Sequence, residues 1–174
     1  MNIGRKNLIG CLAILIAAAS LFVGWQWWGS PARLLRIYDY ETGELIRQES
    51  VKVGDKLFFG WVHSWEKIPW HEYYHIEKNN TLVLDTIAYP AFGAGIPENK
   101  GKKCYIKDKM IYMDEIGQVF QQFDWINSHF ATRDIKLNDE LLMTGKDLPE
   151  HRRLILRIEE RRLWNGGQQE NGRQ

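Results

Sequence analysis

Hydrophobic and polar residues alternate with a period of two along most of the chain after Leu34. This period is typical of strands that bury one face. The segment 56–64 is an example, because its alternate residues Leu57, Phe59, Trp61 and His63 share a face. About eight or nine short strands, with turn residues about every 8–12 positions, predict an all-β fold, either an antiparallel β-sandwich or a partly closed barrel.

Turn residues set the boundaries of these strands. Thr42-Gly43 and Asn79-Asn80 each separate a pair of alternating segments, and Asn tolerates the positive φ that a tight hairpin turn requires. Residues 115–127 fit neither a helical nor a strand pattern, and the Gly-, Gln- and Asn-rich residues 165–174 are expected to form a disordered tail. The expected strands are 34–40, 44–50, 56–64, 70–78, 81–89 and 154–158.

The N-terminal segment has a different pattern. Leu8 to Trp25 is a run of 18 uncharged residues, which as a helix is about 27 Å long and sufficient to cross a bilayer core. Arg5 and Lys6 precede it, and Trp25, Trp27 and Trp28 lie at its end, where indoles favour the headgroup level. We interpret residues 1–30 as an uncleaved membrane anchor and residues 31–164 as a β domain on one side of the membrane.

Three alternatives to an anchor remain. A cleaved signal peptide has a shorter apolar core than this run. A lipoprotein is suggested by Leu8-Ile9-Gly10-Cys11, although the apolar run follows the cysteine and does not precede it. A buried core helix of a soluble protein is the third. The positively charged residues on the two sides are nearly balanced and do not fix the orientation.

Composition excludes several classes of protein. The 23 Lys and Arg residues nearly balance 22 Asp and Glu, so there is no basic excess for a nucleic-acid partner. A hydrophobic fraction of 44% is too high for a disordered chain, and two cysteines cannot form a disulfide scaffold.

One motif suggests a metal site but does not fit one. His71-Glu72-Tyr73-Tyr74-His75 matches the H-E-x-x-H pattern of zinc peptidases, which requires a helix to bring both imidazoles to one ion. The segment follows Pro69 and reads as a strand, where the two histidines would lie about 13 Å apart. We therefore expect no metal and no cofactor, and keep a zinc peptidase as the third functional hypothesis.

Two other stretches carry a family resemblance. The first is His63-Ser64-Trp65-Glu66-Lys67-Ile68-Pro69-Trp70-His71-Glu72, and the second contains Phe92-Gly93-Ala94-Gly95-Ile96-Pro97. Together they resemble an uncharacterised bacterial family that pairs an H-S-x(4)-P-x-x-E segment with an F-G-A-G-[LI]-P loop. Over residues 45–160, the motif positions are His63, Ser64, Pro69 and Glu72, then Phe92, Gly93, Ala94, Gly95, Ile96 and Pro97.

The genes of that family commonly lie beside TRAP transporters of the TAXI class. The resemblance therefore implies an extracytoplasmic β domain at the bacterial inner membrane, with a single-pass anchor, that works without catalysis beside the transporter's membrane subunits or its solute receptor. An independent small-ligand-binding module is the alternative.

The residues also predict where the two motifs meet. The Asn79-Asn80 hairpin returns the chain so that Tyr89 lies beside Trp70, which brings the 92–97 loop to the same end of the sheet as His63 and Glu72. Such a His–Glu pair can brace the fold, contact a ligand or partner, or take part in catalysis. The glycines permit a tight turn or the close approach of another group.

Overall fold

The computed structural model describes residues 33–93, 97 and 100–160. The chain divides into two units, Met1–Pro31 and Ala32–Gln174, and every described residue belongs to the second. The predicted anchor, with Leu8, Trp25, Trp27 and Trp28, lies outside the described residues, and so does the predicted tail. Among the residues that are described, no helix is long and apolar enough to span a membrane.

Twelve strands and one short 3-10 helix, η1 (Gly145–Asp147), make up the described part of the chain. The strands are β1 (Arg33–Asp39), β2 (Leu45–Val51), β3 (Lys56–Val62), β4 (Pro69–Ile76), β5 (Leu82–Tyr89), β6 (Lys103–Lys107), β7 (Met110–Asp114), β8 (Gln118–Phe120), β9 (Phe123–Ile126), β10 (Thr132–Leu137), β11 (Glu140–Thr144) and β12 (Arg153–Glu160).

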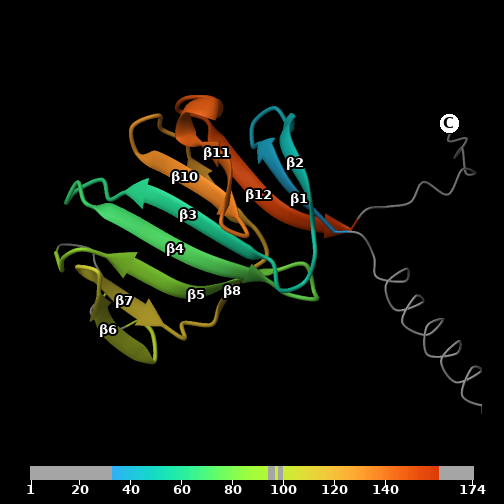
Figure 1. Cartoon of the computed structure of the whole chain (residues 1–174). Helices are drawn as coiled ribbons and strands as arrows, with labels where there is room; N and C mark the ends of the chain where they lie inside the picture. The colour runs from blue at the N-terminus through green and yellow to red at the C-terminus, as the bar shows by residue number, and fades with distance from the viewer. Residues whose placement is uncertain (1–32, 94–96, 98–99, 161–174) are drawn as a thin grey trace, which may run out of the picture. The chain divides into compact units, whose positions relative to one another are not determined.

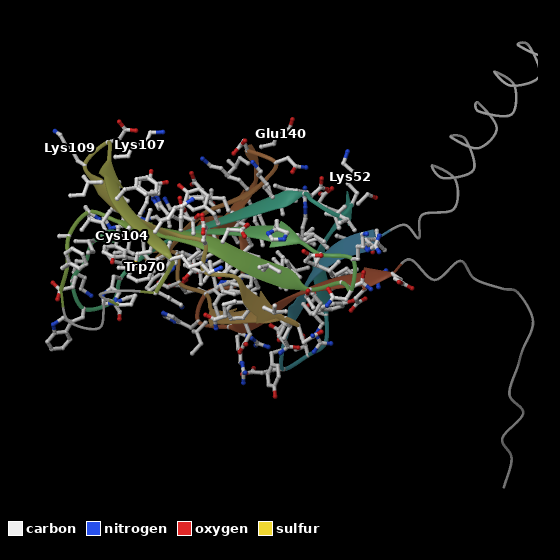
Figure 2. The ribbon with its side chains drawn as sticks, turned by 90° about the horizontal axis from the view of Figure 1, so that it is seen from below. Lys52, Trp70, Cys104, Lys107, Lys109 and Glu140 are labelled. Carbon is white, nitrogen blue, oxygen red and sulfur yellow. The ribbon has the colours of Figure 1, made fainter. Side chains whose placement is uncertain are left out.

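The strands form two antiparallel sheets. The smaller sheet has the order β2-β1-β12-β9, and the larger has the order β11-β10-β3-β4-β5-β7-β6, with β8 paired to β5. Figure 1 shows β10, β3, β4 and β5 side by side, with β1 and β12 in the separate sheet. The predicted all-β antiparallel class is confirmed: the fold resembles a sandwich and is not closed into a barrel.

One core lies between the two sheets. Its most buried members come from both, including Leu35 and Ile37 of β1, Leu156 of β12 and Leu57 and Ile76 of the larger sheet. On β4 the even-numbered residues Trp70, Tyr74 and Ile76 are buried on the inner face, as expected for a period of two. A bulge between Tyr73 and Tyr74 shifts the register against β5.

The predicted strands agree with the structure except near their ends. The predicted hairpin is present, and Asn80 has the positive φ, 62°, that its turn requires. The turn is longer than the two residues predicted, because β4 ends at Ile76 and β5 begins at Leu82. The prediction that β3 includes His63 and Ser64 is wrong, because the strand ends at Val62 and the chain turns there. The ambiguous segment 115–127 contains β8 and β9, each short enough to weaken any periodic signal.

Candidate functional site

Glu72 lies on the inner face of β4, among residues that are otherwise aromatic or apolar. It is directly opposite Phe59 of β3, and Trp61 of β3 is opposite Trp70. Alternation places Trp70, Glu72 and Tyr74 on the same face of the strand, toward the smaller sheet. The strand period thus puts a carboxylate where most strands carry a hydrophobic residue.

Neutral donors surround the Glu72 carboxylate. Trp70 Nε1 donates to Oε1 at 3.0 Å, and the Tyr74 hydroxyl donates to Oε2 at 2.6 Å. Trp61 is the third donor, and its interaction lowers the pKa of the same group less than those of Tyr74 and Trp70 do. We call Glu72 with these three donors the Glu72 site. A carboxylate has about four acceptor positions, so most of its capacity is used within the protein.

The Glu72 site has no counter-ion. Among the described residues, no Lys, Arg or His forms an ion pair with Glu72, and Lys100 acts on it only weakly, through its charge. Burial raises the pKa of Glu72 above its ordinary value, and the hydrogen bonds from Tyr74, Trp70 and Trp61 only partly oppose this. Burial also raises the pKa of the Tyr74 hydroxyl, with the Glu72 charge adding to the effect.

A cavity of about 260 Å³ adjoins this carboxylate, where the two sheets face each other. We call it the inter-sheet cavity. Strands β3, β4, β9 and β10 and the residue before β10 contribute its walls. It is lined by Phe59, Trp61, Glu72, Phe123, Trp125, Ile126, Ala131 and Thr132.

The aromatic walls of the inter-sheet cavity are fixed by ring contacts. The Phe59 ring meets those of Phe123 and Trp125 edge to face, with centroids 4.8 Å and 5.3 Å away. Phe123 and Trp125 are tilted by 30° at 5.5 Å. The Trp125 indole Nε1 is buried and has no hydrogen-bond partner among the described residues. An unsatisfied buried donor calls for an explanation such as a water or a ligand.

Trp70 connects the two predicted motifs. The His63 ring lies 5.8 Å from the Trp70 ring on one side, and the Tyr89 ring stacks at 5.1 Å. The predicted return of Tyr89 beside Trp70 is therefore confirmed. His63 does not hydrogen-bond to Glu72: its Nδ1 accepts from the backbone N–H of Glu66 at 3.3 Å. The pair is linked through the Trp70 side chain.

The second motif approaches the first through Tyr89 and Glu66. The Tyr89 hydroxyl donates to the Pro97 carbonyl at 3.0 Å, and the Phe92 ring lies 5.8 Å from that of Tyr89. A methyl group on Gly93 would come within 2.6 Å of the Glu66 carboxyl carbon. Gly93 therefore permits a close approach. Ala94, Gly95 and Ile96 lie outside the described residues.

The remaining motif residues have less enclosed positions. Ser64 is exposed in the turn after β3, and Pro69 begins β4 opposite Val62. Phe92 and Trp65 are among the most exposed large side chains, at 57% and 78%. Both lie in the segments that carry the motifs, at the end of the larger sheet where β3 and β5 finish (Figure 1).

The H-E-x-x-H residues lie on a strand, as predicted, and its two histidines have different surroundings. His71 packs against Phe58, and burial, with the nearby Lys136 charge, lowers its pKa. His75 lies between Asp85, at 2.7 Å, and Glu77. Although burial acts to lower the pKa of His75, these two carboxylates raise it overall. Within the described residues, no cluster of three metal-ligating side chains occurs.

Sequence reasoning did not identify several residues of the cavity. Tyr74 appeared only as a strand residue, and Phe123 and Trp125 lay in a segment with no clear pattern. A usable signal was present on β4, where Glu72 interrupts the otherwise apolar inner positions Trp70, Tyr74 and Ile76. The aromatic residues of β9 could be assigned to the site only once their pairing with β12 was known.

Comparison with known proteins identifies part of the chain. Residues 58–143 match the family described as "Domain of unknown function (DUF1850)". No curated protein and no solved structure matches the chain. The matched range includes both motifs and every residue that lines the inter-sheet cavity.

Proposed function

We propose that this chain is a single-pass, membrane-anchored accessory protein of a TAXI-type TRAP transporter at the bacterial inner membrane. Its β unit faces the extracytoplasmic side and acts by binding, without catalysis. The transporter's membrane subunits or its solute receptor are the partner. An anchor would keep the β unit beside the membrane subunits and raise its effective concentration there.

One observation carries this proposal: two separated motifs lie together at one end of the larger sheet. Trp70 and Tyr89 tie His63, Glu72 and Pro97 into one packed unit. Next to this unit, Trp65 and Phe92 expose large aromatic surfaces to solvent. Exposed aromatic residues that are held by a well-packed part of the fold are typical anchors of protein interfaces.

Co-purification with the transporter tests the proposal. We expect the full chain to retain the TRAP membrane subunits or the solute receptor in mild detergent, and the double change Trp65→Ala, Phe92→Ala to reduce this at least about tenfold. Phe130→Ala is a matched control, because Phe130 is 62% exposed but lies just before β10, outside both motifs. Retention that is equal in the double variant, or absent in the wild type, would contradict the proposal.

A second candidate function is an independent small-ligand-binding module. The inter-sheet cavity favours it, because a cavity that joins aromatic walls with a few polar groups is typical of ligand sites. The co-purification experiment separates the two functions, since a ligand-binding module needs no transporter subunit.

A further inference from the structure

The Glu72 site places negative charge beside aromatic rings without supplying a cation. The carboxylate and the rings of Trp61, Phe123 and Trp125 line the same inter-sheet cavity. Aromatic ring faces attract cations, and the attraction strengthens when water is excluded. Glu72 is a half-buried carboxylate without a counter-ion, and it adds to that attraction because the local dielectric is lower than that of water.

The hydrogen bonds of Glu72 restrict the kind of cation. Trp61, Trp70 and Tyr74 already donate to the carboxylate, which leaves about one acceptor position. A primary ammonium has three N–H donors and would leave most of them unsatisfied in this apolar cavity. A fully methylated ammonium has no N–H group and requires only charge and ring contact.

The Trp125 indole supplies a second, independent feature. Its Nε1 is buried and without a partner among the described residues, although its ring forms part of the cavity wall. Such a donor needs an acceptor that the described residues do not supply, and an oxygen atom of a bound molecule can supply it. The cavity volume, about 260 Å³, is slightly below the range of drug-sized ligands and suits a small molecule.

From these features we infer that the inter-sheet cavity binds a small quaternary-ammonium compound that carries an oxygen acceptor. The methylated ammonium lies against the rings and faces Glu72, and the oxygen accepts from Trp125 Nε1. This inference goes beyond the transporter proposal and does not depend on it. Its tests measure ligand binding, whereas the transporter proposal is tested by retention of protein subunits.

Calorimetric titration of the full chain in detergent with choline and glycine betaine tests the inference. Each probe carries a trimethylammonium group and an oxygen acceptor. The control probe is 3,3-dimethylbutan-1-ol, which has the shape of choline without its charge. We expect at least one cationic probe to bind with a Kd below about 10 mM and the neutral control to bind at least about tenfold more weakly.

Two variants locate the binding. Glu72→Gln removes the charge but keeps an acceptor, and we expect it to weaken binding at least about tenfold. Trp125→Phe keeps a ring in the wall but removes Nε1, and we expect a smaller loss, of about threefold to tenfold. Asp85→Asn is the matched control, because this carboxylate pairs with His75 away from the cavity, and we expect no change.

Unfolding of the variants is checked by circular dichroism, so that a loss of binding is not confused with a loss of structure. If a folded Glu72→Gln protein binds as the wild type does, the inference is wrong. It is equally wrong if the neutral control binds as well as choline, or if neither cationic probe binds the wild type.

Discussion

Asp39 is buried and Glu72 is half-buried, and the protein surrounds the two carboxylates with different partners. At the end of β1, Asp39 receives Arg152 Nη2 at 2.9 Å on Oδ1, and the Arg152 Nε lies 2.9 Å from Oδ2. Backbone N–H groups of Glu41 and Thr42 also donate to Oδ1. At Glu72, three neutral side chains donate and no cation pairs with the carboxylate among the described residues.

The two environments shift the pKa of each carboxyl in opposite directions. The hydrogen bond from Arg152, together with that from the Thr42 backbone, lowers the pKa of Asp39 to about 2. Burial raises the pKa of Glu72. Asp39 has both a cation partner and backbone donors within the protein, and it stabilises the turn after β1. Glu72 has its donors but lacks a charge partner, which is the arrangement expected of a site that a bound cation completes.

The largest effect is expected when Trp70, which packs beside Glu72 and donates to it, is replaced by a small residue. Trp70→Ala deletes a side chain that is 7% exposed, contacts the His63 and Tyr89 rings, and donates to Glu72. We expect the free energy of unfolding to fall by about 3–5 kcal/mol, as for other large-to-small core changes. Urea denaturation measures this. A loss below about 1 kcal/mol would contradict the packing described here.

Two substitutions of Glu72 separate the effect of losing its acceptor atoms from the effect of losing its charge. Glu72→Ala leaves the Trp70, Tyr74 and Trp61 donors without their acceptor, and we expect the free energy of unfolding to fall by about 1–3 kcal/mol. Glu72→Gln keeps an acceptor and removes an unpaired charge, so its loss should be below about 1 kcal/mol at neutral pH. Equal losses in the two variants would indicate that the charge stabilises the fold.

Unfolding as a function of pH sharpens the same comparison. The pKa of Glu72 is raised above 4.5 by burial, so its contribution to stability is greatest below pH 4.5 and declines as the pH rises through the folded-state value. The pKa of Asp39 is lowered from 3.8 to about 2 by Arg152, so its contribution is present above pH 3.8 and is lost as the pH falls through about 2.

Variants assign each part of that pH profile. We expect Glu72→Gln to flatten the decline above pH 4.5 and leave the acid limb unchanged. Asp39→Asn should do the reverse, by removing the loss below pH 3.8. Thermal unfolding at a series of pH values measures both, and an unaltered profile in either variant would refute the corresponding pKa shift.

The smallest effect is expected at Gly93. Its added Cβ would meet the Glu66 carboxyl group, the flexible end of a long side chain, and its φ lies outside the left-handed region. We therefore expect Gly93→Ala to change the free energy of unfolding by less than about 0.5 kcal/mol, with Glu66 moving aside. Denaturation of the full chain in detergent measures this. A fall in the free energy of unfolding above about 2 kcal/mol would show that Glu66 cannot move away from position 93.

The strand pattern predicted most of the fold and part of the site. The alternating pattern and the Asn79-Asn80 turn predicted the consecutive strands β3, β4 and β5. Antiparallel pairing of β4 with β5 then predicted that Tyr89 lies beside Trp70, as it does. Local pattern could not show that Trp70 separates His63 from Glu72, because that depends on side-chain packing across strands.

The cavity wall was beyond sequence reasoning for a different reason. Phe123 and Trp125 lie on β9, a strand of four residues whose place is fixed by pairing with β12. So short a strand gives too few positions for a period to be read. The contact of Phe59 with both rings then depends on how the two sheets face each other, which no local segment specifies.

Direct titration of the Glu72 carboxyl group tests the central claim of an unpaired carboxylate that a cation completes. Carbon-13 NMR of the full chain in detergent, with the Glu72→Gln spectrum to assign the signal, gives the pKa with and without choline. We expect a midpoint above 4.5 in the free protein that moves downward when choline is bound, because the cation favours the ionised form. A midpoint at or below 4.5 that choline does not move would contradict the account.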